Sequence, residues 1–180
     1  MSSSWSGIAA EISLQFIAAG QTLGGMLESG ELDVLLGADR PSCFGRNPHV
    51  QRLFPNPRET EREYFRKTGV FPIMHTLVIR ESVYRKDPWI AGSLFQSFQQ
   101  AKDWCFQQAR FSAALKYSLP WLAADLEEMD SLFGPDPWPY GLEANRKTLE
   151  TLMRYVVEQR LMDQAVPLEE LFAQIPAPAA

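Results

Sequence analysis

Gly30-Glu31-Leu32-Asp33-Val34-Leu35-Leu36-Gly37-Ala38 holds a short, dense apolar run between two glycines. Within it, residues 32–36 are apolar except for Asp33. A near-continuous apolar run of this length is expected of a strand that other elements cover on both faces. Such strands belong to sheets flanked by helices, so this stretch indicates the α/β fold class.

The residues before this stretch predict the rest of a β-α-β unit. Residues 12–16 alternate between apolar and polar side chains, which indicates a half-buried strand. Thr22 can cap a short helix that follows, and Gly30 can end that helix. Two strands joined by a helix are therefore expected within the first forty residues.

The residues after the stretch predict a loop, one more strand and then helices. The loop covers residues 37–48, a helix over 58–67 ends at Thr68-Gly69, and residues 70–79 form a strand-like run. Asp87-Pro88 is suited to the cap and first position of a long helix. Further helices are expected at residues 121–133, 142–161 and 168–172. Because so few strands are predicted, a doubly wound sheet would be incomplete and the fold only partial.

Two of these helices carry apolar residues at helical spacing, which predicts the faces that they bury. On the long helix the predicted inward residues are Ile90, Leu94, Phe98, Ala101 and Cys105. On the helix over residues 142–161 they are Leu149, Leu152, Met153 and Val156.

Composition and charge narrow the class of protein. The 180 residues carry 17 lysines and arginines against 22 aspartates and glutamates, a net charge of −5. A mildly acidic chain lacks the basic face that nucleic acids require, so no nucleic-acid partner is expected. No stretch approaches the roughly 18 apolar residues of a membrane span. Residues 1–7 have neither the basic nor the apolar region of a secretory signal, which predicts a cytoplasmic location.

The sequence lacks the motifs that commonly bind cofactors or supply a catalytic nucleophile. Cys43 and Cys105 are the two cysteines, and their spacing is not that of a metal site. A disulfide between them is one reading, and two free thiols in a reducing compartment is the preferred one. The sequence also has no G-x-S-x-G and no phosphate-binding glycine loop, so neither a metal nor another cofactor is predicted.

Six stretches in a fixed order resemble one known family. They are Gly30 to Ala38, Arg40-Pro41-Ser42-Cys43-Phe44, Thr68-Gly69-Val70-Phe71-Pro72-Ile73-Met74-His75-Thr76, Asp87-Pro88-Trp89-Ile90, the block Asp136-Pro137-Trp138-Pro139-Tyr140-Gly141-Leu142-Glu143-Ala144-Asn145-Arg146, and Glu169-Glu170-Leu171-Phe172-Ala173. Together they resemble the C-terminal part of the 4,5-dihydroxyphthalate decarboxylase family. Members of that family are similar to type II periplasmic binding proteins.

The resemblance implies a partial type II binding-protein-like fold. Residues 1–48 would form the β-α-β end of ligand-binding lobe two, and residues 49–80 the crossover between lobes. Residues 81–175 would form a helical region that packs on lobe one, followed by a frayed tail at 176–180. One wall of a ligand cleft would then belong to this chain, and a homodimer is one way to complete the fold.

The resemblance and the chemistry of decarboxylation together select candidate residues for two tasks, binding a carboxylate and donating a proton. Guanidinium groups match carboxylates, which makes Arg40 and Arg146 candidates for substrate binding. Histidine titrates near working pH, which makes His75 the candidate catalytic proton donor. The alternatives are a surface arginine at Arg40, a plain ion pair between Glu143 and Arg146, and a buried core histidine at His75.

Three further candidates lie in the block after Asp136. Pro137 and Pro139 stiffen the loop that holds Trp138 and Tyr140, which could stack on an aromatic ring and hydrogen bond to its hydroxyl, or could simply cover an apolar edge. Asn145 could bond a ligand or cap the backbone. These candidates predict a small aromatic or carboxylate ligand.

Three functions are compatible with these features. The first is a decarboxylase that converts a dihydroxyphthalate-like aromatic dicarboxylic acid to a dihydroxybenzoate. The second is a non-catalytic solute-binding protein for a small organic anion, as used by ABC transporters. The third is a fragment that depends on a partner and has no activity of its own. A decarboxylase needs a proton source whereas a binding protein does not, so His75 distinguishes the first two.

Overall fold

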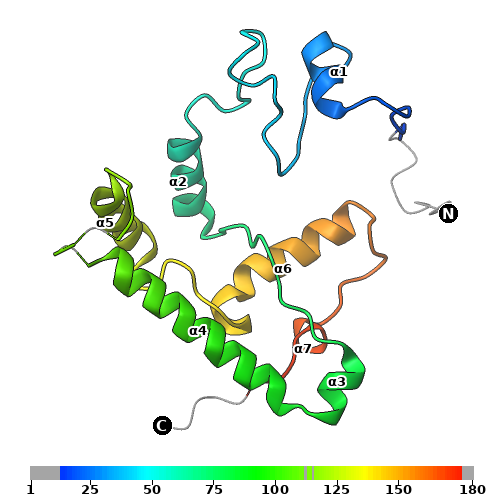
Figure 1. The fold of residues 1–180 in the computed structure, drawn as a ribbon. Helices are drawn as coiled ribbons and strands as arrows, with labels where there is room; N and C mark the ends of the chain where they lie inside the picture. The colour runs from blue at the N-terminus through cyan, green and yellow to red at the C-terminus, as the bar shows by residue number, and fades with distance from the viewer. Residues whose placement is uncertain (1–12, 112, 115, 176–180) are drawn as a thin grey trace. The chain divides into compact units, whose positions relative to one another are not determined.

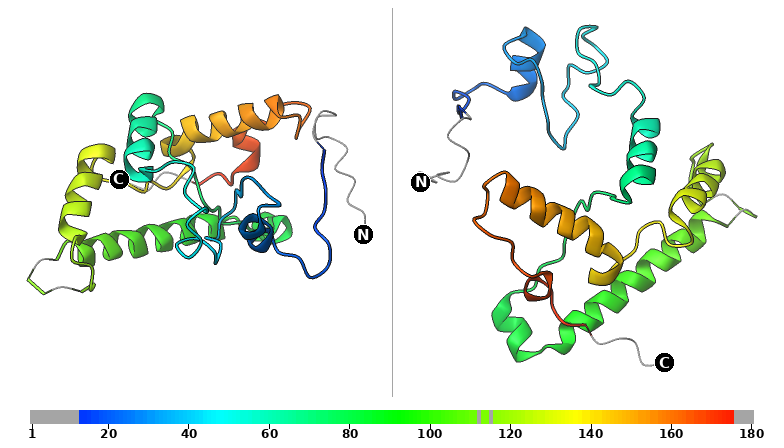
Figure 2. Two further views of the ribbon diagram at one scale, coloured as in Figure 1. Left: turned by 90° about the horizontal axis from the view of Figure 1, so that it is seen from above. Right: turned by 180° about the vertical axis from the view of Figure 1, so that it is seen from behind.

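The computed structural model describes residues 13–111, 113–114 and 116–175. The chain divides into two compact units, Met1–Glu63 and Tyr64–Ala180. Figure 1 and Figure 2 show the course of the chain through both units. The expected structure of residues 1–12 and of the tail at 176–180 lies outside the described residues.

The first unit is built on the short helix α1 (Leu23–Ser29). Thr22 caps it, because the Thr22 side chain accepts a hydrogen bond from the Gly25 backbone N–H at 3.1 Å. Gly30 ends it in the left-handed conformation at φ 80°, which glycine adopts without a Cβ penalty. The predicted helix and both of its ends are confirmed.

The loop after α1 packs back onto that helix. Cys43 is fully buried, and its Sγ lies 3.6 Å from the Gly24 carbonyl oxygen. The Asn47 side-chain amide donates to the Glu28 carbonyl oxygen at 3.4 Å. The buried thiol and this amide therefore attach residues 41–47 to α1.

Helix α2 (Pro57–Thr68) begins in the first unit and ends in the second. The remaining helices of the second unit are α3 (Glu81–Lys86), α4 (Trp89–Ala109), α5 (Leu122–Phe133), α6 (Leu142–Glu158) and α7 (Leu168–Leu171). Helix α3 contacts α4, and α6 contacts α7. The buried apolar residues of this unit are Val70, Ala91, Leu126, Leu149 and Leu168. Every helix predicted from the sequence is present, with ends that differ by a few residues.

The expected strands do not form a sheet within the described residues. Residues 32–36 and 70–79 have no paired strand there, and residues 13–16 are likewise unpaired. Leu36 is 97% exposed and Val78 is 84% exposed, so these apolar runs are largely uncovered, although Val70 at the start of the second run is buried. A strand is stable only beside a partner that accepts its backbone hydrogen bonds, and the described residues supply none. The α/β class and the type II binding-protein-like fold therefore stay predictions.

The buried residues of α4 differ from the predicted ones. Phe98 and Cys105 are exposed, whereas Ala91 and Lys102 are buried. Lys102 was not among the residues predicted to face inward, and its ammonium group has a carboxylate partner that allows burial. On α6, Leu149 is buried as expected and Leu152 is mostly exposed.

The second unit leaves large apolar side chains exposed, among them Trp104 on α4 and Trp121 at the start of α5. Among the described helices, none is long and apolar enough to cross a lipid bilayer.

Candidate functional site

Arg40 and Arg52 of the first unit lie around a single aromatic ring. The guanidinium carbon of Arg40 is 5.6 Å from the centroid of the Phe44 ring, and that of Arg52 is 5.3 Å from it. Both distances are within the range of cation–π attraction. The structure thus places the predicted Arg40 at the same ring as a second arginine that was not predicted.

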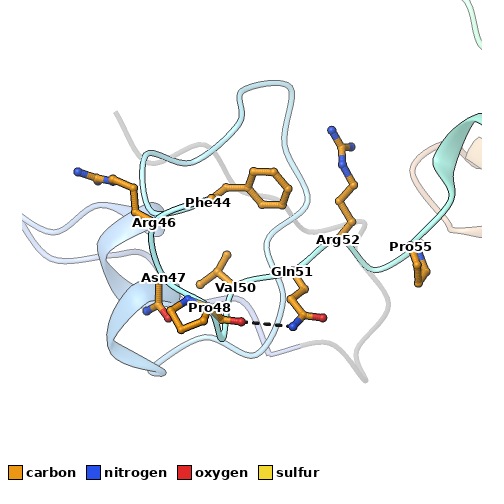
Figure 3. Close-up of a pocket in the computed structure, with 9 residues that line it drawn as sticks. Phe44, Arg46, Asn47, Pro48, Val50, Gln51, Arg52 and Pro55 are labelled. Atoms are coloured by element: carbon orange, nitrogen blue, oxygen red, sulfur yellow. Dashed lines mark hydrogen bonds between the residues drawn. The ribbon is translucent and has the colours of Figure 1, made fainter.

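A shallow pocket of about 450 Å³ lies along the same segment, as Figure 3 shows. Its lining residues are Phe44, Gly45, Arg46, Asn47, Pro48, Val50, Gln51, Arg52 and Pro55. The Gln51 side-chain amide donates to the Pro48 carbonyl oxygen at 3.3 Å, drawn as a dashed line in Figure 3. The pocket combines an aromatic ring, apolar proline and valine side chains and cationic groups.

His75 lies in the exposed extended segment 71–78 of the second unit. Within the described part of the chain, no backbone group of residues 71–79 takes part in a hydrogen bond. His75 is not buried, so the core-histidine alternative does not describe it here. The catalytic role of His75 stays a prediction.

The loop with Trp138 and Tyr140 is attached to α4 by Lys102. The Lys102 Nζ donates to both carboxylate oxygens of Asp136, at 2.8 and 2.7 Å, and to the Trp138 carbonyl oxygen at 2.9 Å. It also lies 4.7 Å from the centroid of the Tyr140 ring. All three ammonium protons are used, so Lys102 supports this loop and presents no free donor.

The Trp138 ring packs against an aromatic cluster and covers an apolar edge. It meets the Phe71 ring edge-on at 5.7 Å between centroids, and Phe71 in turn meets Phe133 at 5.2 Å. The ring centroids of Phe133 and Phe65 are 4.5 Å apart. These contacts support the covering role for Trp138, and Trp138 still keeps part of its surface exposed.

Asn145 closes the same loop from the first turns of α6. Its side-chain amide donates to the carbonyl oxygens of Pro139 and Gly141, at 2.8 and 2.9 Å. Both amide protons are therefore occupied by the backbone, which corresponds to the capping alternative. Only the Asn145 carbonyl oxygen is left as a potential acceptor for a ligand.

Arg146 is surrounded by carboxylates. Its guanidinium group donates to Glu143 at 2.6 Å and to Glu169 at 2.7 Å, and it lies 3.7 Å from Glu150. The hydrogen bond from Arg146 lowers the pKa of both Glu143 and Glu169. In turn, the hydrogen bond with Glu143 and, second in size, the hydrogen bond with Glu169 raise the pKa of Arg146 above its ordinary value. A substrate carboxylate would have to compete with these partners, and the main effect of the cluster is to attach α7 to α6.

Sequence reasoning missed two residues of these arrangements. Lys102 stands on a predominantly apolar helix face, and its partner Asp136 is 34 residues away, so no local pattern links them. Arg52 could have been found from charge, because residues 40–58 contain four arginines and no acidic residue. Within the described residues, no group of three or more histidine, cysteine, aspartate or glutamate side chains could hold a metal ion.

The chain is similar to two known proteins that carry the same name. The chain is 31% identical over 162 residues to a Comamonas testosteroni protein named 4,5-dihydroxyphthalate decarboxylase, which covers 89% of this chain and 49% of that protein. A Pseudomonas putida protein of the same name is 43% identical over 47 residues, or 26% of this chain and 18% of that protein. The chain thus spans about half the length of the first relative. No protein-family model matches it.

Proposed function

We propose that this chain belongs to a decarboxylase of the 4,5-dihydroxyphthalate type, acting on an aromatic dicarboxylic acid with two ring hydroxyls. The observation that carries the proposal is the similarity to the Comamonas testosteroni relative along 89% of this chain. Both relatives are named as enzymes, which favours catalysis over simple capture of a solute.

The proposed reaction requires a proton and a firm hold on one carboxylate. Adding a proton to the ring carbon that bears the departing carboxylate gives a cation, which the para hydroxyl stabilises. The carbon–carboxylate bond then breaks, CO2 leaves, and the bonding pair restores the aromatic ring to give a dihydroxybenzoate. His75 is proposed as the proton donor and Arg40 as the group that holds the retained carboxylate.

We also propose that catalysis requires a larger fold than the described residues form. The backbone of residues 71–79 is unpaired within the described part of the chain, and Leu77 and Val78 are exposed. An apolar extended segment of this kind suits a strand of a sheet covered on both faces. The missing strands are proposed to come from segments equivalent to the uncovered half of the first relative, or from a second copy of this chain, in a type II binding-protein-like architecture.

The test compares decarboxylation of 4,5-dihydroxyphthalate, followed by CO2 release, in two proteins. One is this chain alone, and the other is this chain joined to the half of the Comamonas testosteroni relative that it does not match. Turnover only in the joined protein is expected, because an open cleft neither excludes water nor orients donors. No turnover in the joined protein, if it folds, would refute the proposed activity.

His75→Gln in the joined protein tests the proton donor. We expect it to lower kcat by about a hundredfold or more, which is the usual contribution of a positioned acid. His49→Gln is the matched control, because His49 is the other histidine and lies exposed in the first unit. Equal turnover in the two variants would remove His75 from the mechanism.

A further inference from the structure

We infer that Arg40, Phe44 and Arg52 form a binding site for a small aromatic carboxylate. The inference rests on the proposed function only for the choice of ligand. It adds Phe44 and Arg52 to Arg40, and it assigns the carboxylate-binding task to the first unit.

The first argument is charge. Among the described residues, no carboxylate forms an ion pair with Arg40 or Arg52, although the chain has 22 acidic residues. In the second unit, by contrast, Arg85, Arg110 and Arg146 each have a carboxylate partner. Two guanidinium groups around one ring therefore keep their N–H donors available for an anion from outside.

The second argument is that backbone and side-chain bonds define the segment's shape. The Phe44 N–H donates to the Pro41 carbonyl oxygen at 3.0 Å, and the Asn47 N–H donates to the Cys43 carbonyl oxygen at 2.9 Å. The Val50 N–H donates to the Asn47 carbonyl oxygen at 3.1 Å, which continues the turn towards Arg52. These turns return the chain so that Arg52 reaches the ring of Phe44.

The attachment to α1 gives the segment a fixed base. The buried Cys43 lies directly before Phe44 in the sequence and contacts the Gly24 carbonyl oxygen through its Sγ. Arg46 is held differently from Arg40 and Arg52, because its Nε donates to the Ser42 carbonyl oxygen at 2.6 Å. Arg46 therefore supports the turn, and the other two arginines are left for a ligand.

The third argument concerns the class of ligand. A guanidinium group that stacks on a ring still presents its planar edge, which matches a carboxylate through two parallel hydrogen bonds. The adjoining pocket offers Val50, Pro48 and Pro55, whose apolar surfaces suit a flat hydrocarbon ring. An inorganic anion would gain nothing from these surfaces, so an aromatic carboxylate is the ligand that the site fits.

The experiment measures binding of phthalate to the 180-residue chain by calorimetry, with sulfate and cyclohexane-1,2-dicarboxylate as comparison ligands. We expect phthalate to bind more tightly than sulfate. Arg40→Gln and Arg52→Gln should each weaken phthalate binding about tenfold or more, as expected for the loss of a charge-assisted hydrogen-bond pair. Arg85→Gln is the matched control, because it removes one positive charge from an exposed arginine in the second unit.

Folding of each variant is checked through Cys43, which stays protected from thiol reagents only while the segment packs on α1. The site would be refuted if the chain did not bind phthalate. It would also be refuted if Arg52→Gln and Arg85→Gln weakened phthalate binding equally. Equal affinity for sulfate and phthalate would overturn the aromatic ligand class.

Failure of this site and failure of the proposed function give different results. Turnover by the joined protein without arginine-dependent binding would refute the site alone. Arginine-dependent phthalate binding without turnover in the joined protein would refute the decarboxylase alone.

Discussion

Replacement of Lys102 by methionine tests whether the ammonium group holds the loop after Asp136 in place. The Lys102 side chain is 6% exposed, whereas that of Asp136 is 46% exposed. Methionine fills a similar volume, but it loses two charge-assisted hydrogen bonds, the bond to the Trp138 carbonyl oxygen and the attraction to the Tyr140 ring. Because water can reach the half-exposed Asp136, the expected cost is about 2 kcal/mol, below the full penalty of a broken buried pair.

The assay is urea unfolding of the 180-residue chain followed by far-UV circular dichroism. A loss of about 2 kcal/mol lowers the urea midpoint by about 1 M. Lys86→Met is the control, because Lys86 is exposed in the last turn of α3, and its cost should stay below about 0.5 kcal/mol.

Asp136→Asn sharpens the test by leaving the buried ammonium group without its anion. We expect this change to lower the free energy of unfolding by about 3 kcal/mol, which is at least as much as Lys102→Met. This is expected although Asp136 is the more exposed partner. The two changes together should cost clearly less than their sum, because they remove one shared interaction. Additive costs, or a Lys102→Met variant as stable as Lys86→Met, would refute the reasoning.

Two further predictions concern the α6–α7 contact and the thiols. Arg146 lowers the pKa of Glu143 and Glu169 below the ordinary 4.5, so the stability that these pairs contribute is present above pH 4.5 and is lost as pH falls through the lowered values. The amide protection factors in α7, corrected for the intrinsic pH dependence of exchange, should therefore fall in that acidic window, and Arg146→Gln should lower them already at neutral pH. Protection factors in α7 that neither change lowers would contradict the pairing. Cys105 is exposed and Cys43 is buried, so a thiol reagent should label Cys105 in the folded chain and Cys43 only in denaturant, and equal labelling rates in the folded chain would contradict the burial of Cys43.

Local signals in the sequence predicted the helices well. The cap at Thr22, the glycine stop at Gly30 and the Asp87-Pro88 start all lie within a few residues of the helix end that they define. The predicted helix at 142–161 begins at Leu142 as expected and ends three residues early, at Glu158. Caps and helical periodicity act over one or two turns, so the sequence alone is sufficient to locate them.

The candidate site could be predicted only in part. Arg40 was identified as a guanidinium group that could bind a carboxylate, and the ion pair between Glu143 and Arg146 was weighed as the alternative for Arg146. The partner of Arg40 at Phe44, the second guanidinium at Arg52 and the contact from Arg146 to Glu169 came from the folded chain. Each of these contacts depends on a turn or a helix packing that side-chain spacing does not specify.

The buried face of α4 and the fate of the two apolar runs were set by tertiary contacts. Periodicity alone assigned Phe98 and Cys105 to the core, but on the same side of α4 the buried residues are Ala91 and the paired Lys102. The runs at 32–36 and 70–79 have the composition of strands, yet within the described residues they have no strand beside them. Helices satisfy their backbone bonds within one segment, whereas a strand needs a second segment, and for that reason strand propensity did not suffice to make a sheet.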